Sequence, residues 1–138
     1  MNTKSEYMLL FAGNEWYNEL SYPEIKKLTE DAKAWFEGLI AQGKVKGGNG
    51  LGRSGARVAA KTGRVISDGP YAESKEAVGG FTVIEAANLE EAIAIAKSNP
   101  TVRYGTTIEI RPVFSSYEDC PLYRRLQELE REQAAIAA

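Results

Sequence analysis

The chain has 138 residues, a length typical of one domain, and its 17 basic and 19 acidic residues give a net charge of −2. It contains no histidine, which excludes a Ser-His-Asp triad and zinc bound by imidazole, and its one cysteine, Cys120, allows no internal disulfide. The acidic balance argues against a nucleic-acid partner, whose footprint is a clustered excess of Lys and Arg.

The first apolar run, EYMLLFA at residues 6–12, is apolar on both alternating faces. Such a pattern predicts a strand in the centre of a sheet, covered on both sides. The run is far too short to span a bilayer, and Asn14 and Glu15 follow it where a signal peptide would have small residues. We therefore expect a cytoplasmic protein with no membrane partner.

A long amphipathic helix is predicted to start at Ser21, which has capping-box spacing to Glu24, with Pro23 in the first turn. Gly43 provides the stop signal. The apolar residues that recur at helical intervals are Ile25, Leu28, Ala32, Trp35, Phe36 and Leu39.

Residues 43–55 are expected to form a glycine-rich connector. After it, residues 56–61 and 64–67 are predicted to be two short strands joined by a turn at Thr62 and Gly63. Another strand is predicted over residues 79–86.

Asn88 marks the start of a second helix, which ends at Asn99 and Pro100. A last strand is predicted over residues 106–114, and a third helix over residues 119–138. The apolar residues of that third helix are spaced nearly as in a heptad, at Leu122, Leu126, Leu129 and Ile136.

This order of elements predicts a ferredoxin-like α+β sandwich with both helices on one face of an antiparallel sheet. The other face still carries apolar side chains, and a monomer rarely leaves such a patch in water. We therefore expect a homodimer. The expected division is a domain over residues 1–114 and a helical extension over residues 115–138, which lies on the same domain or on the partner.

The run GLGRSG at residues 50–55 matches G-x-G-x-x-G, but it is expected to leave a helix and enter a strand. A dinucleotide site needs the opposite context, a strand leading into a helix, so a mobile loop beside a pocket is the better interpretation. Arg53 in this loop could reach an anionic ligand.

Residues 67–81 concentrate ionisable side chains: Asp68, Glu73 and Glu76 with Lys75 and the phenol of Tyr71. Asp68 could simply accept hydrogen bonds from the amides of its own turn. Alternatively, neighbouring carboxyls beside a pocket raise one another's pKa and make a proton carrier.

The segment from Asp68 to Phe81 resembles the signature of the YCII-related, DGPF-domain proteins, with Tyr71 where many members have phenylalanine. Residues 7–10 and 109–113 also fit the two ends of the family's sequence pattern, so the resemblance covers residues 5–114. The resemblance implies a ferredoxin-like fold that assembles into a dimeric α/β barrel, and a superfamily of small isomerases, dehydrochlorinases and monooxygenases. Some members are encoded beside or fused to sigma factors. The family's His-Asp pair cannot be carried over, since only Asp68 matches it.

Glu109 and Arg111 are two apart on one predicted strand and share a face. They could form an ion pair, or they could line a cavity between two sheets where Arg111 binds a carboxylate. Arg103 and Tyr104, just before this strand, are weaker candidates for ligand binding.

These observations predict a protein that binds a small, anionic organic ligand in a pocket at the dimer interface. If it is catalytic, Asp68 acts as general acid-base in an isomerisation or elimination, Tyr71 assists, and Arg111 or Lys75 orients the substrate. Arg53, Glu73 and Glu109 complete the predicted binding residues, with no cofactor and no metal. The alternative is a non-catalytic binding or regulatory module, linked to transcription regulation or to a protein surface that includes the third helix.

Overall fold

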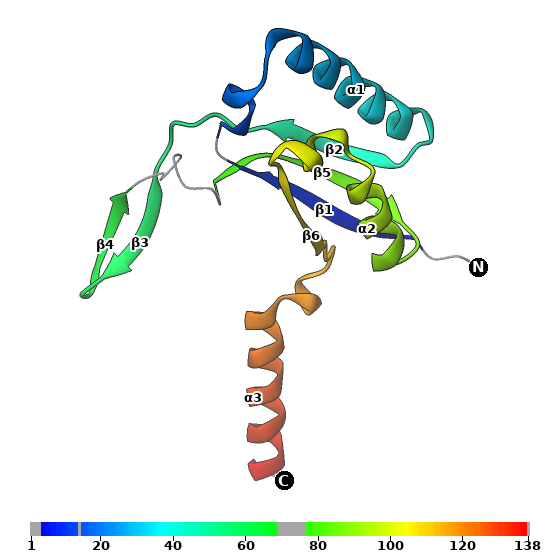
Figure 1. Cartoon of the computed structure of the whole chain (residues 1–138). Coiled ribbons are helices and arrows are strands. Elements are labelled where there is room, and N and C mark those ends of the chain that lie inside the picture. Colours follow the sequence, from blue (N-terminus) through cyan, green and yellow to red (C-terminus); the bar gives the residue numbers. More distant parts are fainter. Residues whose placement is uncertain (1–3, 14, 69–76, 138) are drawn as a thin grey trace.

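The computed structural model describes residues 4–13, 15–68 and 77–137 (Figure 1). Its strands are β1 (Ser5–Ala12), β2 (Val45–Gly50), β3 (Arg57–Lys61), β4 (Arg64–Asp68), β5 (Val78–Ala86) and β6 (Thr107–Pro112). The helices are α1 (Tyr22–Ala41), α2 (Leu89–Lys97) and α3 (Pro121–Ala137), with the short 3-10 helices η1 (Trp16–Glu19), η2 (Pro100–Tyr104) and η3 (Tyr117–Asp119).

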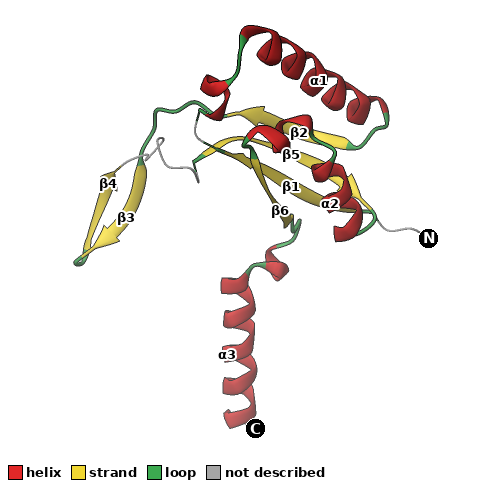
Figure 2. Cartoon of the chain, in the orientation of Figure 1, coloured by secondary structure: helices red, strands yellow, loops and turns green. Residues whose placement is uncertain are grey.

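Four antiparallel strands form the main sheet in the order β2-β5-β1-β6. β1 therefore has a neighbour on each side, as its two apolar faces predicted. Both α1 and α2 lie on one face of the sheet (Figure 2). This α+β arrangement is compatible with a ferredoxin-like fold.

The prediction that residues 43–55 form a connector was wrong for part of this segment. Val45–Gly50 forms the strand β2 at the edge of the main sheet. β3 and β4, expected as part of the sheet, instead pair only with each other and project as a separate hairpin (Figure 1). The run at residues 50–55 consequently leaves a strand, not a helix, and it still opens no helix.

The start of α1 is set by the predicted capping box. The Ser21 hydroxyl accepts a hydrogen bond from the Glu24 amide at 3.4 Å, and a Glu24 carboxylate oxygen accepts one from the Ser21 amide at 2.9 Å. These bonds satisfy two backbone donors that no helical carbonyl reaches.

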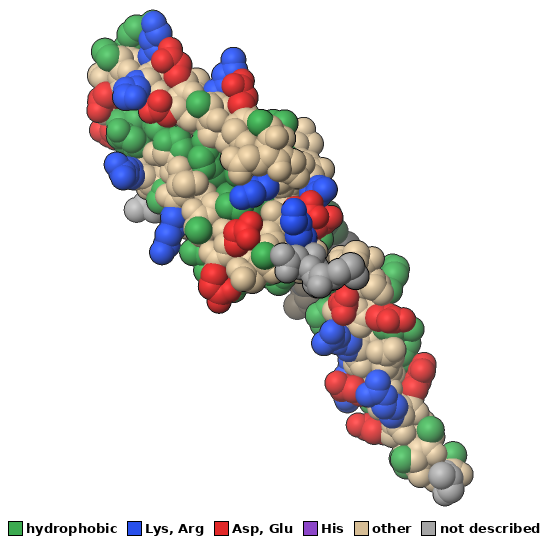
Figure 3. Space-filling view, turned by 90° about the vertical axis from the view of Figure 1, so that its right-hand side faces the viewer, with side chains coloured by type: hydrophobic (Ala, Val, Ile, Leu, Met, Phe, Trp, Pro, Cys, Tyr) green, Lys and Arg blue, Asp and Glu red, His purple; other side chains and the backbone are tan. Residues whose placement is uncertain are grey.

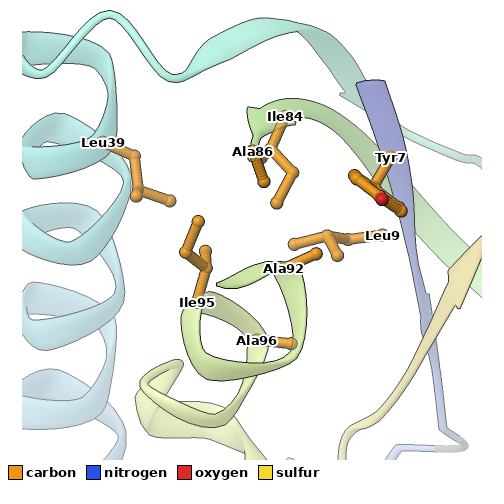
Figure 4. Packing of buried hydrophobic residues seen from close by; sticks show 8 residues of the cluster. All are labelled: Tyr7, Leu9, Leu39, Ile84, Ala86, Ala92, Ile95 and Ala96. Atoms are coloured by element: carbon orange, nitrogen blue, oxygen red, sulfur yellow. The ribbon is translucent and has the colours of Figure 1, made fainter. Parts of the chain in front are cut away.

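The core lies between the sheet and the two helices (Figure 4). Leu9 and Ile84, from the central strands, have no exposed surface. Around them pack Tyr7, Leu39, Ala86, Ala92, Ile95 and Ala96. The small side chains of α2 let this helix approach the sheet closely, so the core is concentrated under α2 and the end of α1.

The open face of the sheet, which points away from α1 and α2, carries a square of four apolar residues. Met8 pairs with Val83 across the strands, and Leu10 pairs with Phe81. All four are only partly buried, whereas their strand neighbours on the helix side are covered. The chain as a monomer thus leaves an apolar patch in solvent.

α3 extends away from the sheet, and charged side chains cover much of its surface (Figures 1 and 3). None of its residues is buried, and Leu122 is 79% exposed. Within the described part of the chain, no helix combines the length and the apolar character needed to cross a membrane.

Candidate functional site

A cavity of about 910 Å³ opens where the hairpin meets the main sheet. Its walls come from the ends of β1 and β5, from η1, and from the loop between β2 and β3. This is the loop that contains Arg53, which the sequence placed beside a pocket.

Arg53 is held in the cavity wall by an ion pair with Glu15, in which Nη1 lies 2.6 Å from Oε1. The two side chains are 50% and 47% exposed, so water and small solutes reach them. Glu15 has left-handed backbone angles (φ 39°, ψ 31°), a conformation that costs energy for a residue with a side chain. The fold therefore maintains a strained residue that presents a carboxylate to Arg53.

Aromatic rings form another wall of this cavity. Trp16 and Tyr17 meet edge to face with ring centroids 5.6 Å apart, and both line the cavity. Trp16 lies directly against Gly105, where an added Cβ would come within 2.6 Å of the Trp16 Cβ. Glycine at this position is what allows Trp16 to lie against the turn before β6.

The hairpin brings the backbone of Asp68 to the same region. Asp68 is the last residue of β4, which is one residue longer than the predicted strand, and it pairs with Arg57, which lines the cavity. The side chain of Asp68 and the whole of Tyr71, Glu73 and Lys75 lie outside the described residues.

Glu109 and Arg111 lie elsewhere, on the open face of the sheet. Their cross-strand neighbours are Leu10 and Met8, and Arg111 Nη1 lies 3.3 Å from Glu109 Oε2. Both side chains are more than half exposed. Neither lines the cavity at Arg53, so the structure does not bring these two groups of predicted ligand residues together.

Arg103 and Tyr104 line a further cavity, of about 650 Å³, between α1 and η2. Its walls are rich in charged surface side chains of α1, such as Lys27 and Asp31, which already pair with each other. Arg103 and Tyr104 therefore line a different cavity from the one that Arg53 lines.

Lys46 and Glu85, which do not line the cavity at Arg53, shift each other's pKa. On the open face, a hydrogen bond from Lys46 lowers the pKa of the Glu85 carboxyl, and the same bond raises the pKa of Lys46. Among the residues that the structure describes, no group of three or more His, Cys, Asp or Glu side chains could hold a metal ion.

Sequence reasoning missed Glu15, Trp16 and Tyr17. Trp16 packs against Gly105 and also lines the cavity. The available signal was a polar and aromatic cluster directly after a buried strand, which is where loops carry binding residues.

The family model of the YCII-related domain matches residues 7–116, and no curated protein matches the chain. The match starts in β1, ends just after β6, and leaves α3 outside. Because it spans well over half of the sequence, the chain belongs to the YCII-related domain family.

Proposed function

We propose that this protein binds a small organic anion in the cavity at the root of the hairpin. The observation that carries the proposal is the Arg53–Glu15 pair, half exposed in the wall of a cavity of about 910 Å³. Cavities of a few hundred to a thousand Å³ with a few polar groups are typical of small-molecule sites.

The ion pair suggests how the anion is bound. A ligand carboxylate can replace Glu15 as the partner of Arg53, and the planar guanidinium can hold it through two parallel hydrogen bonds. The faces of Trp16 and Tyr17 provide apolar contact for the rest of the ligand.

Acid-base chemistry at Asp68 is a second proposal, supported by the pairing of its backbone with that of Arg57, which lines the cavity. In an isomerisation, the carboxylate would take a proton from one ligand carbon and return it to another, so no cofactor is consumed. Tyr71, Glu73 and Lys75 would assist and orient the ligand.

We further propose that two copies pair through the open face of the sheet. This pairing would bury the apolar square of Met8, Leu10, Phe81 and Val83, and Glu109 with Arg111 would lie at its margin. The alternative to a ligand-binding protein is a protein-binding module. The exposed leucines of α3 favour this alternative.

The test compares two arginines that both hold a carboxylate. Binding of small carboxylates is measured by calorimetry for the unaltered chain, for Arg53→Gln and for Arg111→Gln. We expect Arg53→Gln to weaken binding tenfold or more, while Arg111→Gln has the affinity of the unaltered chain. The opposite result would place the anion on the open face and reject the cavity.

A further inference from the structure

The sheet has no side chains on part of its helix-facing surface. Gly48 and Gly50 of β2 pair with Thr82 and Gly80 of β5, so all four share the face that looks toward α1. Thr82 is buried, which confirms the direction of this face. Three of the four positions are glycine, so at these three positions the sheet beneath α1 is bare backbone.

α1 does not close down on this floor. A hollow of about 610 Å³ remains between them, and its upper wall is made by Ala32, Phe36 and Ile40 of α1. Ile40 is 60% exposed although it borders the hollow. The hollow is therefore open to solvent, and concave surfaces with mostly apolar walls are typical of small-molecule sites.

Phe11 and Phe36 line the hollow. Phe11 of β1 and Phe36 of α1 have ring centroids 6.2 Å apart, and Trp35 meets Phe36 edge to face at 4.8 Å. Trp35 is fixed by a hydrogen bond of 2.8 Å from Nε1 to the Ser98 hydroxyl. These contacts hold Phe36 in place, so the hollow has a firm aromatic wall.

The hollow adjoins the cavity of Arg53. Both are lined by Phe11, Gly79 and Thr106, which therefore lie at the boundary between them. An apolar compartment thus opens beside a compartment with a guanidinium group.

We propose that the hollow under α1 binds the apolar body of the ligand while its carboxylate binds Arg53. The ligand class is an amphipathic monocarboxylate with one aromatic ring or a branched aliphatic group of similar size. The carboxylate end of this inference rests on the proposed function, and the apolar end rests on the hollow alone.

The test fills the hollow from either side. Gly50 is suited to Gly50→Val, because the nearest atom to an added Cβ is the Gly79 carbonyl oxygen at 3.9 Å. Ala32→Leu fills the same space from α1, and Ala34→Leu, at an exposed position of the same helix, is the control. Thermal melts establish that each variant is folded, so a failure of one filling variant leaves the other.

Calorimetry with 3-phenylpropionate and propionate measures the two compartments separately. We expect the unaltered chain and Ala34→Leu to bind 3-phenylpropionate at least tenfold more tightly than propionate. The filling variants should lose this preference and keep their affinity for propionate. A preserved preference in the filling variants, or no binding of 3-phenylpropionate at millimolar concentration, overturns the inference.

Arg53→Gln distinguishes the two proposals. If it weakens both ligands while the filling variants change nothing, the hollow is rejected and the proposed function stands. If the filling variants remove the preference for the phenyl group while Arg53→Gln changes neither affinity, the hollow stands and the carboxylate site is rejected.

Discussion

Leu9 and Leu122 are the same residue type in opposite surroundings, one with no exposed surface and the other 79% exposed. Leu9→Ala should lower the free energy of unfolding by about 2–5 kcal/mol, because it leaves a cavity among close-packed side chains. Leu122→Ala should change it by less than about 0.5 kcal/mol. Urea denaturation measures both, and equal effects would contradict the packing described for β1.

Glu24 predicts a pH dependence. The Ser21 amide, and to a lesser extent the Ser21 hydroxyl, hold the pKa of the Glu24 carboxyl below its ordinary value. Its folded pKa is thus lower than its unfolded pKa, so the stabilisation is complete above the ordinary pKa and is lost as pH falls through the lowered one.

A carboxyl titration followed by NMR checks this effect. In Ser21→Ala, the pKa of Glu24 should rise part of the way to its ordinary value, because the amide donor remains. An unchanged pKa would show that the hydroxyl has no role.

At this scale, local pairs are predictable and distant pairs are not. Ser21 and Glu24 are three residues apart, and their spacing alone predicts the cap. Arg53 and Glu15 are separated by 38 residues, and only the fold joins them. For the same reason, the sequence predicted that Arg53 binds an anion but did not predict its ion pair with Glu15.

Among the elements, β2 shows how the backbone alone can make a strand. Gly48 lies so close to β5 that an added Cβ would be 2.5 Å from the Phe81 carbonyl oxygen, whereas Gly47 has nothing within 4 Å. Gly48→Ala should therefore destabilise the protein by about 1–3 kcal/mol, and Gly47→Ala should have little effect. Thermal melts compare them, and equal melting temperatures would contradict the pairing of β2 with β5.

The same glycines explain why this strand was not predicted. Of the residues Val45–Gly50, only Val45 has a side chain that favours strands, and glycine disfavours them. Hydrogen bonds to the exposed edge of β5 supply what the side chains do not. By contrast, β1 was predictable because its own side chains are apolar on both faces.

α3 gives the second prediction for an element. It has no buried residue, so removal of residues 117–138 should leave the free energy of unfolding of the remaining domain within about 0.5 kcal/mol of the full chain. Urea denaturation of both chains at low concentration measures this difference. A larger loss would show that α3 packs on the domain in solution.

For the whole molecule, the open face predicts self-association. Sedimentation equilibrium should give the mass of a dimer for the unaltered chain and of a monomer for Leu10→Glu, because a charge at one of the four positions of the apolar square cannot be buried without a partner. Val58→Glu, at a 70% exposed position of the hairpin, is the control and should remain dimeric. A monomeric unaltered chain at micromolar concentration would reject this interface.

The overall architecture was more predictable than the site. Two amphipathic helices between strands dictate one covered face of a sheet, and the structure has this arrangement (Figure 2). The cavities depend instead on where the hairpin leaves the sheet and on glycines that place no side chain under α1. Neither feature has a periodic signal in the sequence.

A crystal structure of the protein with 3-phenylpropionate tests the central claim most directly. The carboxylate should lie within hydrogen-bond distance of Arg53, and the phenyl ring should lie under α1 beside Phe36. Density for the ligand at Arg111, between the sheets of two copies, with both cavities empty of it, would contradict this account.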